Sequence, residues 1–570
     1  MKWLLSLDCL DGSDVAKTLH FSKGHWKDKT KLIYQNKLTQ PALINQSAED
    51  GGVFQMFAES SIGEIEINNT DGVFDFLADY AFDGRSATLT NGATSYSLGV
   101  VDGMYDREGS WFFSFNSLSE TLNDNYPQSS YDAITWDAGL DGKLTPIVFG
   151  DVKNITPVLI DAQLGIYQVS SLSDCRVTAV YYDGQRLPNY AVDGQHMASD
   201  TTIVIKGGTR GVATGKHIVF DGDETNTVYS VSSGISGTSG TITISPVLAA
   251  NIADGTAFDV IDLYGSLSAL QADAAKLYTD GTKLATKWGS YQGYFHLADA
   301  VTGVVTVDCI TQKTTFEVIE SVVANCGISG LTVDDTNQTI DHDIYGGTSG
   351  DTVKNTINRL GSVGYYLNSV TPIKTLLDNI IKSLGCYYWF IVSELNIKVI
   401  DAPASTAIET ISEYQIQNIQ RDGLGLGDNK LPVKGWLIKY RKNWTVMTTV
   451  AGILGTERKE LLGKDFQELD YINTTTQTRH LLSKQVNLES YLNTKLSAGL
   501  VKTQLNSTSS VRRDMISITS KDLSLFDSIK IGYAFNVVTD LYGYSSGRKF
   551  VCIAIDFNAV DETVSFKGFG

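Results

Sequence analysis

Proline and cysteine are both scarce in this chain of 570 residues, with 9 and 6 copies, whereas glycine occurs 52 times. No two cysteines have the C-x-x-C spacing of a zinc site or a redox motif. Most of them lie in apolar runs, so we expect reduced, buried thiols in a protein made in a cytoplasm. The six are Cys9, Cys175, Cys309, Cys326, Cys386 and Cys552.

Long apolar runs are missing as well. No stretch approaches the roughly 18–20 apolar residues that cross a bilayer. The apolar start of the chain stops at Asp8, which is too early for the hydrophobic region of a signal peptide. We therefore expect neither a membrane span nor a leader, and export only as part of an assembly or by lysis.

Positive charge is in deficit. The chain holds 45 Lys and Arg against 64 Asp and Glu, which gives a net charge of −19. Residues 301–570 contain 26 of the cations and 28 of the acids, so residues 1–300 carry −17. Phosphate binding needs clustered cations, so this composition argues against a protein that grips nucleic acid. Solubility alone and a functional acidic surface are the two interpretations that stay open.

Complete catalytic motifs are absent from the sequence, which has no H-E-x-x-H and no G-x-S-x-G. Residues 211–217 (GVATGKH) resemble a phosphate loop, but Arg210 stands where glycine is required and His217 where Ser or Thr is required. Residues 423–427 (GLGLG) lack the flanking strand and helix of a dinucleotide loop, so we expect a connector. We predict no catalytic residue, no cofactor and no bound metal, and therefore a protein that is not an enzyme.

Acidic clusters and aromatic runs leave some alternatives open. Residues 221–224 (DGDE) do not follow the order of an EF-hand loop and are expected to form a hairpin tip. Residues 334–335 (DD) and 341–343 (DHD) are further candidates, and a metal site drawn from several elements or a glycosidase pair of acids stays open. Residues 111–113 (WFF) and 387–389 (YYW) are expected in cores and subunit contacts rather than in stacking on sugars or bases.

The sequence does contain many short apolar segments between turn residues. At this length, the pattern predicts a multidomain, mainly β protein with an α+β part. Residues 63–68 (GEIEIN) alternate as a half-buried strand does. Five strands within 201–262 indicate a small sandwich or barrel, near 202–205, 217–220, 228–231, 240–245 and 257–261. Later strands are expected near 436–441, 445–449, 528–531, 534–538, 549–556 and 563–566.

Four helices are expected, at 266–278, from 314 to Gly327, at 372–384 and within 486–504. Thr314 and Glu317 have the spacing of a capping box. In the third helix Thr371 is the expected cap, Pro372 the first helical residue and Gly385 the stop. A hairpin with strands at 387–392 and 395–400 follows it, and helix and hairpin together form the α+β unit.

Several segments resemble the hub proteins of siphophage-type tails, including those of prophages and gene-transfer particles. The family passage "strand, N-x-D-G, short helix, D-G-R, strand" is matched by 65–72 (IEINNTDG) and 83–85 (DGR). A second resemblance covers 146–150, 155–160 and 167–169, and a third runs from 293–297 (GYFHL) to 303–308 (GVVTVD). The fourth is the closing hairpin, with 542–543, 547–550, 553–557 and 564–570. Phe569 departs from the Trp that more usually precedes the last Gly.

This resemblance implies an architecture. It implies an N-terminal hub β-barrel domain at 1–150, a connecting β-rich domain at 151–200 and 263–312, and an α+β domain at 313–430. It also implies a C-terminal hub β-barrel domain at 431–570, whereas the inserted β domain at 201–262 matches nothing in the family. Such hubs look like trimers in which two barrels per subunit form a ring of six similar units on a hexameric tail tube.

The resemblance also implies a place and partners. The chain is expected at the tail tip or baseplate of a virion, after synthesis and assembly in the host cytoplasm. The implied partners are two further copies in a homotrimer, a distal tail or tail tube protein, the tape-measure protein, and a central tail fibre or spike. Genomic DNA would pass without specific binding, and contact with the host envelope would be indirect.

The ring is expected to enclose a channel with an acidic wall, built from 1–150 and parts of 430–570, and to carry 201–262 on its outside. Candidates for the wall are Glu64, Glu66, Asp71, Asp75 and Asp79. Two other functions remain as alternatives: a host-receptor or carbohydrate-binding tail fibre module, favoured by the β-rich 201–262, and a tail-borne glycosidase.

Overall fold

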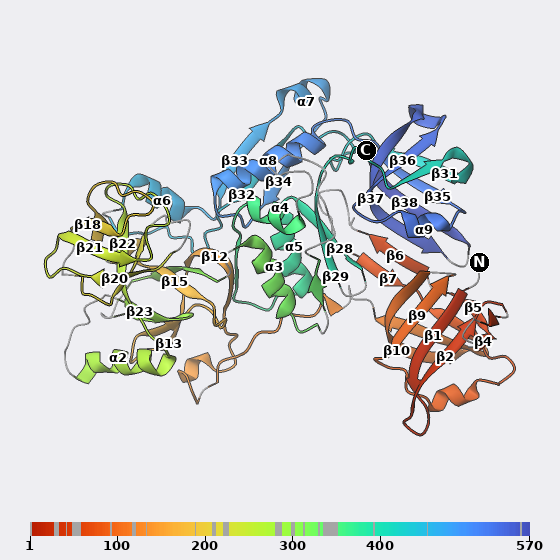
Figure 1. Cartoon of the computed structure of the whole chain (residues 1–570), viewed down its shortest axis with the longest axis horizontal. Coiled ribbons are helices and arrows are strands. Elements are labelled where there is room, and N and C mark those ends of the chain that lie inside the picture. The colour runs from red at the N-terminus through yellow and green to blue at the C-terminus, as the bar shows by residue number, and fades with distance from the viewer. Residues whose placement is uncertain are drawn as a thin grey trace.

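The computed structural model of the chain is shown in Figure 1. It describes residues 3–24, 26–27, 33–41, 43–47, 59–91, 94–116, 121–132, 134–187, 190–207, 212–220, 227–279, 288–297, 303–311, 314–328, 331–334, 352–391, 394–452, 454–558 and 561–570.

The N-terminal sheet closes on itself through one bent segment. β4 pairs parallel with β2, and β5 pairs antiparallel with β8. Only Lys37 separates β4 from β5, so this segment joins both ends of the sheet and makes it a barrel. In spatial order the strands are β3 (Trp26–Lys27), β4 (Ile33–Asn36), β2 (Ala16–Ser22), β1 (Trp3–Leu10), β9 (Ser86–Asn91), β10 (Thr94–Arg107), β11 (Ser110–Asn116), β8 (Ile65–Asn68) and β5 (Leu38–Gln40).

The C-terminal sheet closes by the same device. β30 pairs parallel with β36, β31 pairs antiparallel with β35, and the short 3₁₀ turn η3 (Glu413–Gln415) joins β30 to β31. In spatial order the strands are β30 (Glu409–Ser412), β36 (Ala534–Thr539), β37 (Tyr544–Asn558), β38 (Thr563–Phe569), β35 (Met515–Ser520) and β31 (Ile416–Gly423). The chain thus contains two barrels, each closed by a strand that is parallel to one neighbour and antiparallel to the other.

A third closed sheet lies in the middle of the sequence. Six strands form a ring, in the order β22, β17, β18, β21, β20 and β19, because β19 pairs again with β22. Their bounds are β17 (Tyr190–Val192), β18 (Thr202–Lys206), β19 (His217–Phe220), β20 (Tyr229–Ser233), β21 (Gly240–Ser245) and β22 (Ala257–Leu263). All five strands expected within 201–262 are present, and β17 is a sixth that the sequence analysis missed.

One open group of strands continues from this ring, and another forms a sheet of its own. β22 also pairs with β23, which leads to β24, β14 and β13. A separate five-stranded sheet has the order β16, β15, β25, β12 and β27. The bounds are β12 (Ile147–Ile155), β13 (Val158–Asp161), β14 (Ile166–Gln168), β15 (Arg176–Tyr182), β16 (Gln185–Leu187), β23 (Trp288–Tyr291), β24 (Tyr294–Leu297), β25 (Val305–Ile310) and β27 (Gly364–Leu367).

Two small three-stranded sheets and most of the helices make up the middle of the molecule. One sheet contains β26 (Thr332–Val333), β29 (Glu394–Val399) and β28 (Cys386–Ile391), and the other β33 (Gln467–Ile472), β32 (Gly435–Tyr440) and β34 (Gln485–Glu489). The helices among the described residues are α2 (Leu267–Thr279), α3 (Thr315–Ala324), α4 (Val353–Arg359), α5 (Ile373–Ser383), α6 (Thr456–Gly463), α7 (Thr474–Arg479), α8 (Lys495–Ser509) and α9 (Ser524–Ser528). The 3₁₀ turns besides η3 are η1 (Asp75–Asp79), η2 (Ala138–Leu140) and η4 (Leu541–Gly543).

The molecule is elongated. Both barrels built from the chain ends lie at one end, the six-stranded ring lies at the other, and α3, α5 and β28 lie between them (Figure 1). One hydrophobic core runs from Trp3 through α3 and α5 to Phe569, so the two end barrels and the helical middle share a core. The expected class, mainly β with an α+β part in several domains, is confirmed, whereas the expected domain boundaries stay predictions.

Local signals account for the central helices. The Thr314 and Glu317 capping box is formed, with Glu317 N donating to Thr314 Oγ1 and Thr314 N donating to Glu317 Oε2. In α5 every fourth or third residue is apolar and buried, and Gly385 follows the helix with a φ of +64°. The expected cap Thr371 is wrong: Pro372 takes the N-cap position, and the Thr371 hydroxyl donates to Ser369 O instead.

The helix expected within 486–504 is present as α8, which begins after Thr494, whose hydroxyl accepts from Ser497 N. The residues before it, 485–489, form β34 because they pair with β32. Two other expectations after residue 430 are wrong. Residues 445–449 form no strand, since Asn443 holds this segment by accepting from Thr445 N and donating to Leu462 O. Residues 528–531 are the end of α9 and the loop after it, not a strand.

Gly150 marks a close crossing between the five-stranded sheet and the helical middle. Its φ is +72°, and a Cβ atom there would lie 2.1 Å from Val363 O and 3.0 Å from Val318 Cγ2. Only glycine fits this position, because any other residue would be strained at a positive φ and would carry a Cβ that overlaps Val363 O.

We expect Gly150→Ala to lower the free energy of unfolding by at least about 1–3 kcal/mol, because strain and steric overlap add. Thermal unfolding measures this change. The control is Gly139→Ala, where the added methyl meets no atom within 4 Å. Equal melting temperatures for the two variants would contradict the steric account.

Candidate functional site

The two end barrels are joined by strand pairing. β6 (Leu43–Ser47) lies between β5 and β8 in sequence, yet it pairs antiparallel with β37, with Ile44 opposite Phe557. β7 (Glu59–Ile62) pairs with β6 and extends this sheet, and both strands lie at the boundary between the barrels (Figure 1). The rings of Trp3 and Phe557 meet edge to face at 5.2 Å. This rigid pair of similar barrels is the candidate assembly site.

The five acids expected on a channel wall lie together on the first barrel. Glu64 and Glu66 lie just before and within β8, Asp71 lies in the turn after it, and Asp75 and Asp79 lie in η1. Glu66 is half-buried and the other four are exposed. Tyr105 donates to Glu64 at 2.6 Å, and Lys37 Nζ contacts Asp71 Oδ2 at 2.5 Å. The hydrogen bond from Lys37 holds the pKa of Asp71 below its ordinary value. This part of the surface therefore stays negative at neutral pH, while its place on a channel wall stays a prediction.

The C-terminal barrel instead carries a group of arginines around one buried carboxylate. Asp514 is fully buried and accepts from Tyr544 at 2.7 Å and from Arg512 Nε at 3.0 Å. Arg421 and Arg548 lie 3.5 Å and 3.8 Å from its Oδ2 atom. Burial raises the pKa of Asp514, but the hydrogen bonds and the arginines outweigh burial, and the pKa lies below its ordinary value. Three cations around one anion leave this end of the barrel positive.

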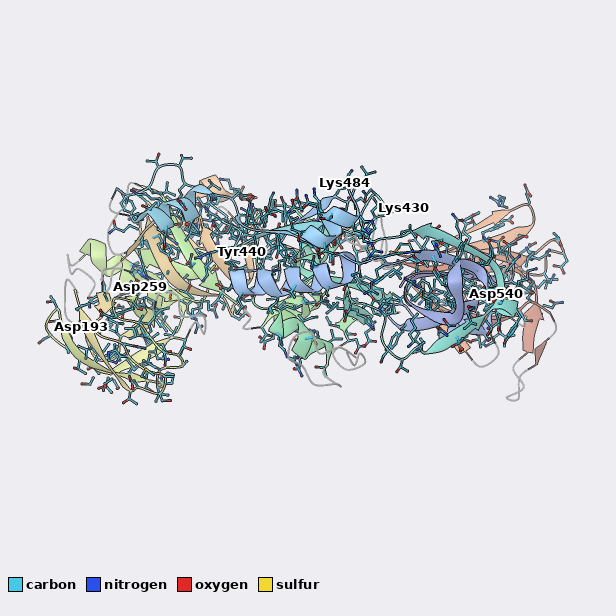
Figure 2. All side chains as sticks on the ribbon, turned by 90° about the horizontal axis from the view of Figure 1, so that it is seen from above. Asp193, Asp259, Lys430, Tyr440, Lys484 and Asp540 are labelled. Atoms are coloured by element: carbon cyan, nitrogen blue, oxygen red, sulfur yellow. The ribbon has the colours of Figure 1, made fainter. Side chains whose placement is uncertain are left out.

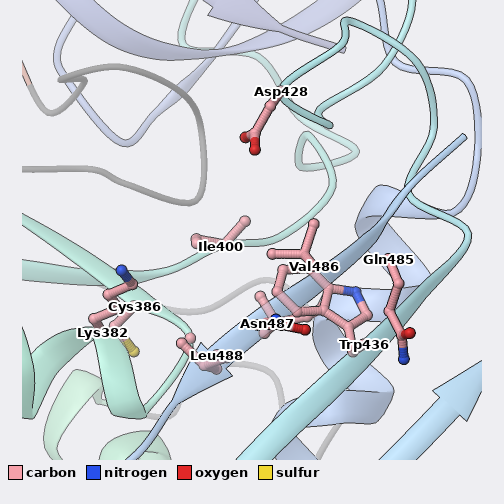
Figure 3. A pocket seen from close by; sticks show the side chains of 11 residues that line it. Lys382, Cys386, Ile400, Asp428, Trp436, Gln485, Val486, Asn487 and Leu488 are labelled. Atoms are coloured by element: carbon pink, nitrogen blue, oxygen red, sulfur yellow. The ribbon is translucent and has the colours of Figure 1, made fainter.

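A cavity of about 260 Å³ lies between α5, β28 and the sheet of β34 (Figure 3). Its walls combine apolar side chains such as Leu488 with polar ones such as Gln485 and Asn487. Lys382 and Asp428 supply charges from opposite sides (Figure 3). Burial raises the pKa of the Cys386 thiol, so this cysteine is a poor nucleophile at neutral pH. The cavity therefore does not pair a nucleophile with a base. Its lining is Lys382, Gly385, Cys386, Ile400, Asp428, Trp436, Gln485, Val486, Asn487, Leu488 and Leu505.

Several residues that the sequence analysis considered as possible binding or metal sites lie in described parts of the structure. His217 lies in β19, and burial lowers the pKa of its imidazole. Residues 423–427 begin at the last residue of β31 and lead toward β32, so they form a connector as expected. The expectation that no strand precedes them is wrong, whereas no helix directly follows them. Residues 208–211, 221–226 and 335–351, which include most of the acidic candidates, lie outside the described residues. In the described part of the chain, no three His, Cys, Asp or Glu side chains gather closely enough to hold a metal ion.

Aromatic runs and cysteines belong to the cores. Phe113, Tyr387, Tyr388 and Trp389 are buried, and Trp111 is half-buried and donates from Nε1 to Phe74 O. All six cysteines are buried and free, as the sequence analysis expected. Among the described helices none is both long and apolar enough to cross a bilayer.

Sequence reasoning missed the Asp514 group and the cavity. The run 512–514 (RRD) is a weak local signal for the former, because it places two arginines beside an aspartate. Arg421 and Arg548 come from distant strands, and nothing local links them to Asp514. The cavity likewise gathers side chains from six separate segments, so no pattern along the chain announces it.

Among solved structures, those similar to this chain include tail proteins. No family model and no curated protein sequence matches it. The tail protein of Neisseria meningitidis MC58 aligns over 100% of this chain and 96% of its own, with 9% identity and a TM-score of 0.37. The 43 kDa tail protein of prophage MuSo2 from Shewanella oneidensis covers 69% of this chain and 98% of its own, with 10% identity and a TM-score of 0.26.

A prophage tail protein of Listeria monocytogenes EGD-e covers 70% of this chain and 90% of its own, with 11% identity and a TM-score of 0.23. These identities and TM-scores are low, so the function proposed below depends on the barrels and their junction.

Asp378 of α5 gives the helical middle a measurable pH dependence. Burial raises its pKa to about 6, although Tyr388 donates to its carboxylate at 2.7 Å and Lys374 Nζ lies 3.7 Å away. The folded state therefore binds this proton more tightly than the unfolded state does, and this group favours folding below about pH 4. That contribution is lost as the pH rises through about 6.

We expect Asp378→Asn to raise the melting temperature at pH 7.5 and to leave it unchanged near pH 4, because the amide carries no charge to bury. The rise in the pKa of Asp378 to about 6 corresponds to a gain of at most roughly 3 kcal/mol in the free energy of unfolding at pH 7.5. Thermal unfolding across pH 4–8 measures it, with the exposed Asp14→Asn as control. A variant that is less stable than the natural chain at pH 7.5 would mean that the buried charge is favourable.

Proposed function

We propose that this chain is the structural hub of a bacteriophage tail tip. It closes the distal end of the tail tube, connects the tube to a central fibre or spike, and opens for passage of DNA. The observation that carries this proposal is the pair of barrels at one end of the molecule. Each barrel is closed by a segment that is parallel to one neighbour and antiparallel to the other, and the pairing of β6 with β37 joins the two barrels.

Symmetry explains why two joined barrels suit this role. Three copies of a chain with two similar barrels provide six similar units around one axis. Such a ring matches a six-fold tube on one face and a three-fold fibre on the other. The strand pairing between the barrels keeps them in one orientation, so each subunit spans one third of the ring as a unit.

Charge supports the passage of DNA. Glu64 and Glu66, just before and within β8, give the first barrel a negative surface, and carboxylates on a channel wall repel phosphates. DNA can then move through the ring without sticking. The remaining neighbours in this proposal are a distal tail or tube protein and the tape-measure protein on the tube side.

We expect three copies of the chain per assembled tail tip, because three pairs of barrels complete a six-unit ring. Native mass measurement of purified tips, together with electron microscopy that locates the chain, tests this number. Six copies or one copy per tip would overturn the proposed hub.

The six-stranded ring of β17–β22 lies at the end of the molecule away from the paired barrels (Figure 1), so we place it outside the hub ring. Ala191 and Ala257 pair across β17 and β22, so an Asn-Gly turn can join them directly. We expect tails to assemble when residues 192–256 are replaced by this turn, as judged by electron microscopy of the particles. Complete loss of tails, with the shortened chain folded and soluble, would instead place the segment in the ring.

A further inference from the structure

Two neighbouring leucines point into solvent at the turn between α7 and β34. Leu481 is 86% exposed and Leu482 is 78% exposed. Single exposed apolar side chains are common, but an adjacent pair of nearly free leucines on a loop tip is typical of a surface that a partner covers.

The backbone of this turn is held in place. Ser483 N donates to His480 O at 2.9 Å, which closes a tight turn with the two leucines at its tip. Asn429 Nδ2 donates to Leu482 O at 2.7 Å, and Lys434 N donates to Lys484 O. The leucines are therefore presented by a fixed turn, and a partner that covers them meets little cost of ordering the loop.

Cations surround this turn. Arg479 precedes it, Lys484 follows it, and Lys430 is exposed on the loop that Asn429 ties to it. The exposed Asp428 of that loop offsets one of these three cations, so the surface stays positive. Lys430 and Lys484 lie together at the middle of the elongated molecule (Figure 2). We call residues 479–484 with Lys430 the basic leucine surface. Its charge fits an acidic partner with apolar groups at its centre.

The first barrel carries the matching features. Between its acids, Val73 is 57% exposed and Phe76 is 41% exposed. Asn69 N donates to Gly109 O, which brings the exposed Glu108 of the β10–β11 turn beside this segment. We call residues 70–79 with Glu108 the acidic knob. Its acids are Asp71, Asp75, Asp79 and Glu108.

We propose that the basic leucine surface of one copy binds the acidic knob of a second copy. Within one chain α7 and the first barrel lie on different sides of the C-terminal barrel (Figure 1), so one copy cannot bring the two surfaces together. The surfaces differ from each other, so the contact is head-to-tail and repeats around an axis until the ring closes. This inference rests on the proposed hub and names the contact between its subunits. It places Asp71, Asp75 and Asp79 in that contact instead of on the channel wall.

The acidic knob makes a second copy of this chain a better partner for the basic leucine surface than a membrane. Cations beside exposed leucines also suit an anionic membrane. The same chain, however, displays a complementary acidic and apolar surface that would otherwise remain uncovered. In this contact apolar side chains meet apolar side chains, and cations meet acids.

The first test removes the leucines from the full chain. We expect the natural chain to sediment as a trimer and Leu481→Ser with Leu482→Ser to sediment as a monomer at the same concentration. The control is Leu496→Ser, which changes a leucine that is 76% exposed at the far end of α8. Trimers that survive loss of both turn leucines, or a natural chain that stays monomeric, overturn the inference.

The second test reverses the charges. Arg479→Glu with Lys484→Glu is expected to give monomers, because acids then face acids. Addition of Asp79→Lys and Glu108→Lys to the same chain is expected to restore the trimer, since the signs are opposite again. The inference is overturned if the double variant Arg479→Glu with Lys484→Glu remains a trimer. It is also overturned if the variant with all four substitutions is folded but stays monomeric.

The third test separates a membrane from a second copy. We expect no flotation of the chain with vesicles that contain phosphatidylserine. Flotation that depends on Leu481 and Leu482 would assign the surface to a membrane and overturn the inference. Tail tips that hold three copies of the double leucine variant would contradict this contact but not the proposed hub. Tips with one or six copies of the chain would contradict the hub itself.

Discussion

The backbone pairing of β6 with β37 is the constraint on which the rest of the molecule depends. It takes a segment from within the first barrel and makes it part of the sheet of the second, with Ile44 opposite Phe557. Paired strands leave no freedom for one barrel to rotate against the other, and the Trp3 and Phe557 rings fill the corner between them. The helical middle then packs on both barrels through one continuous core.

Closure by a bent strand solves a recurring problem of β structure. An open sheet ends in unpaired N–H and C=O groups, which invite pairing with other chains. In both end barrels one segment changes direction, at Lys37 or at η3, and so pairs with the first strand and the last strand of the sheet. The barrels thereby become closed units whose outer side chains, rather than their sheet edges, are available for assembly.

The two barrels differ in charge although they share this construction. The first displays Asp71, Asp75 and Asp79 beside exposed apolar groups, and the second holds Arg421, Arg512 and Arg548 around the buried Asp514. A carboxylate without those guanidinium groups would be costly to bury. One chain therefore carries acids on one barrel and a group of arginines on the other.

The sequence by itself determined the elements whose causes lie within a few residues. The Thr314 and Glu317 cap, the buried stripe of α5, the stop at Gly385 and the alternation in β8 all follow from neighbouring side chains and the period of the element. The five strands within 201–262 were also found, because residues that favour turns separate their short apolar segments in the sequence. Tertiary structure decided that 485–489 is a strand beside β32, that β4 and β30 pair on two sides, and that Arg421 and Arg548 meet at Asp514. Their partners lie far away in the chain, and only packing of the whole molecule brings them within reach of a hydrogen bond.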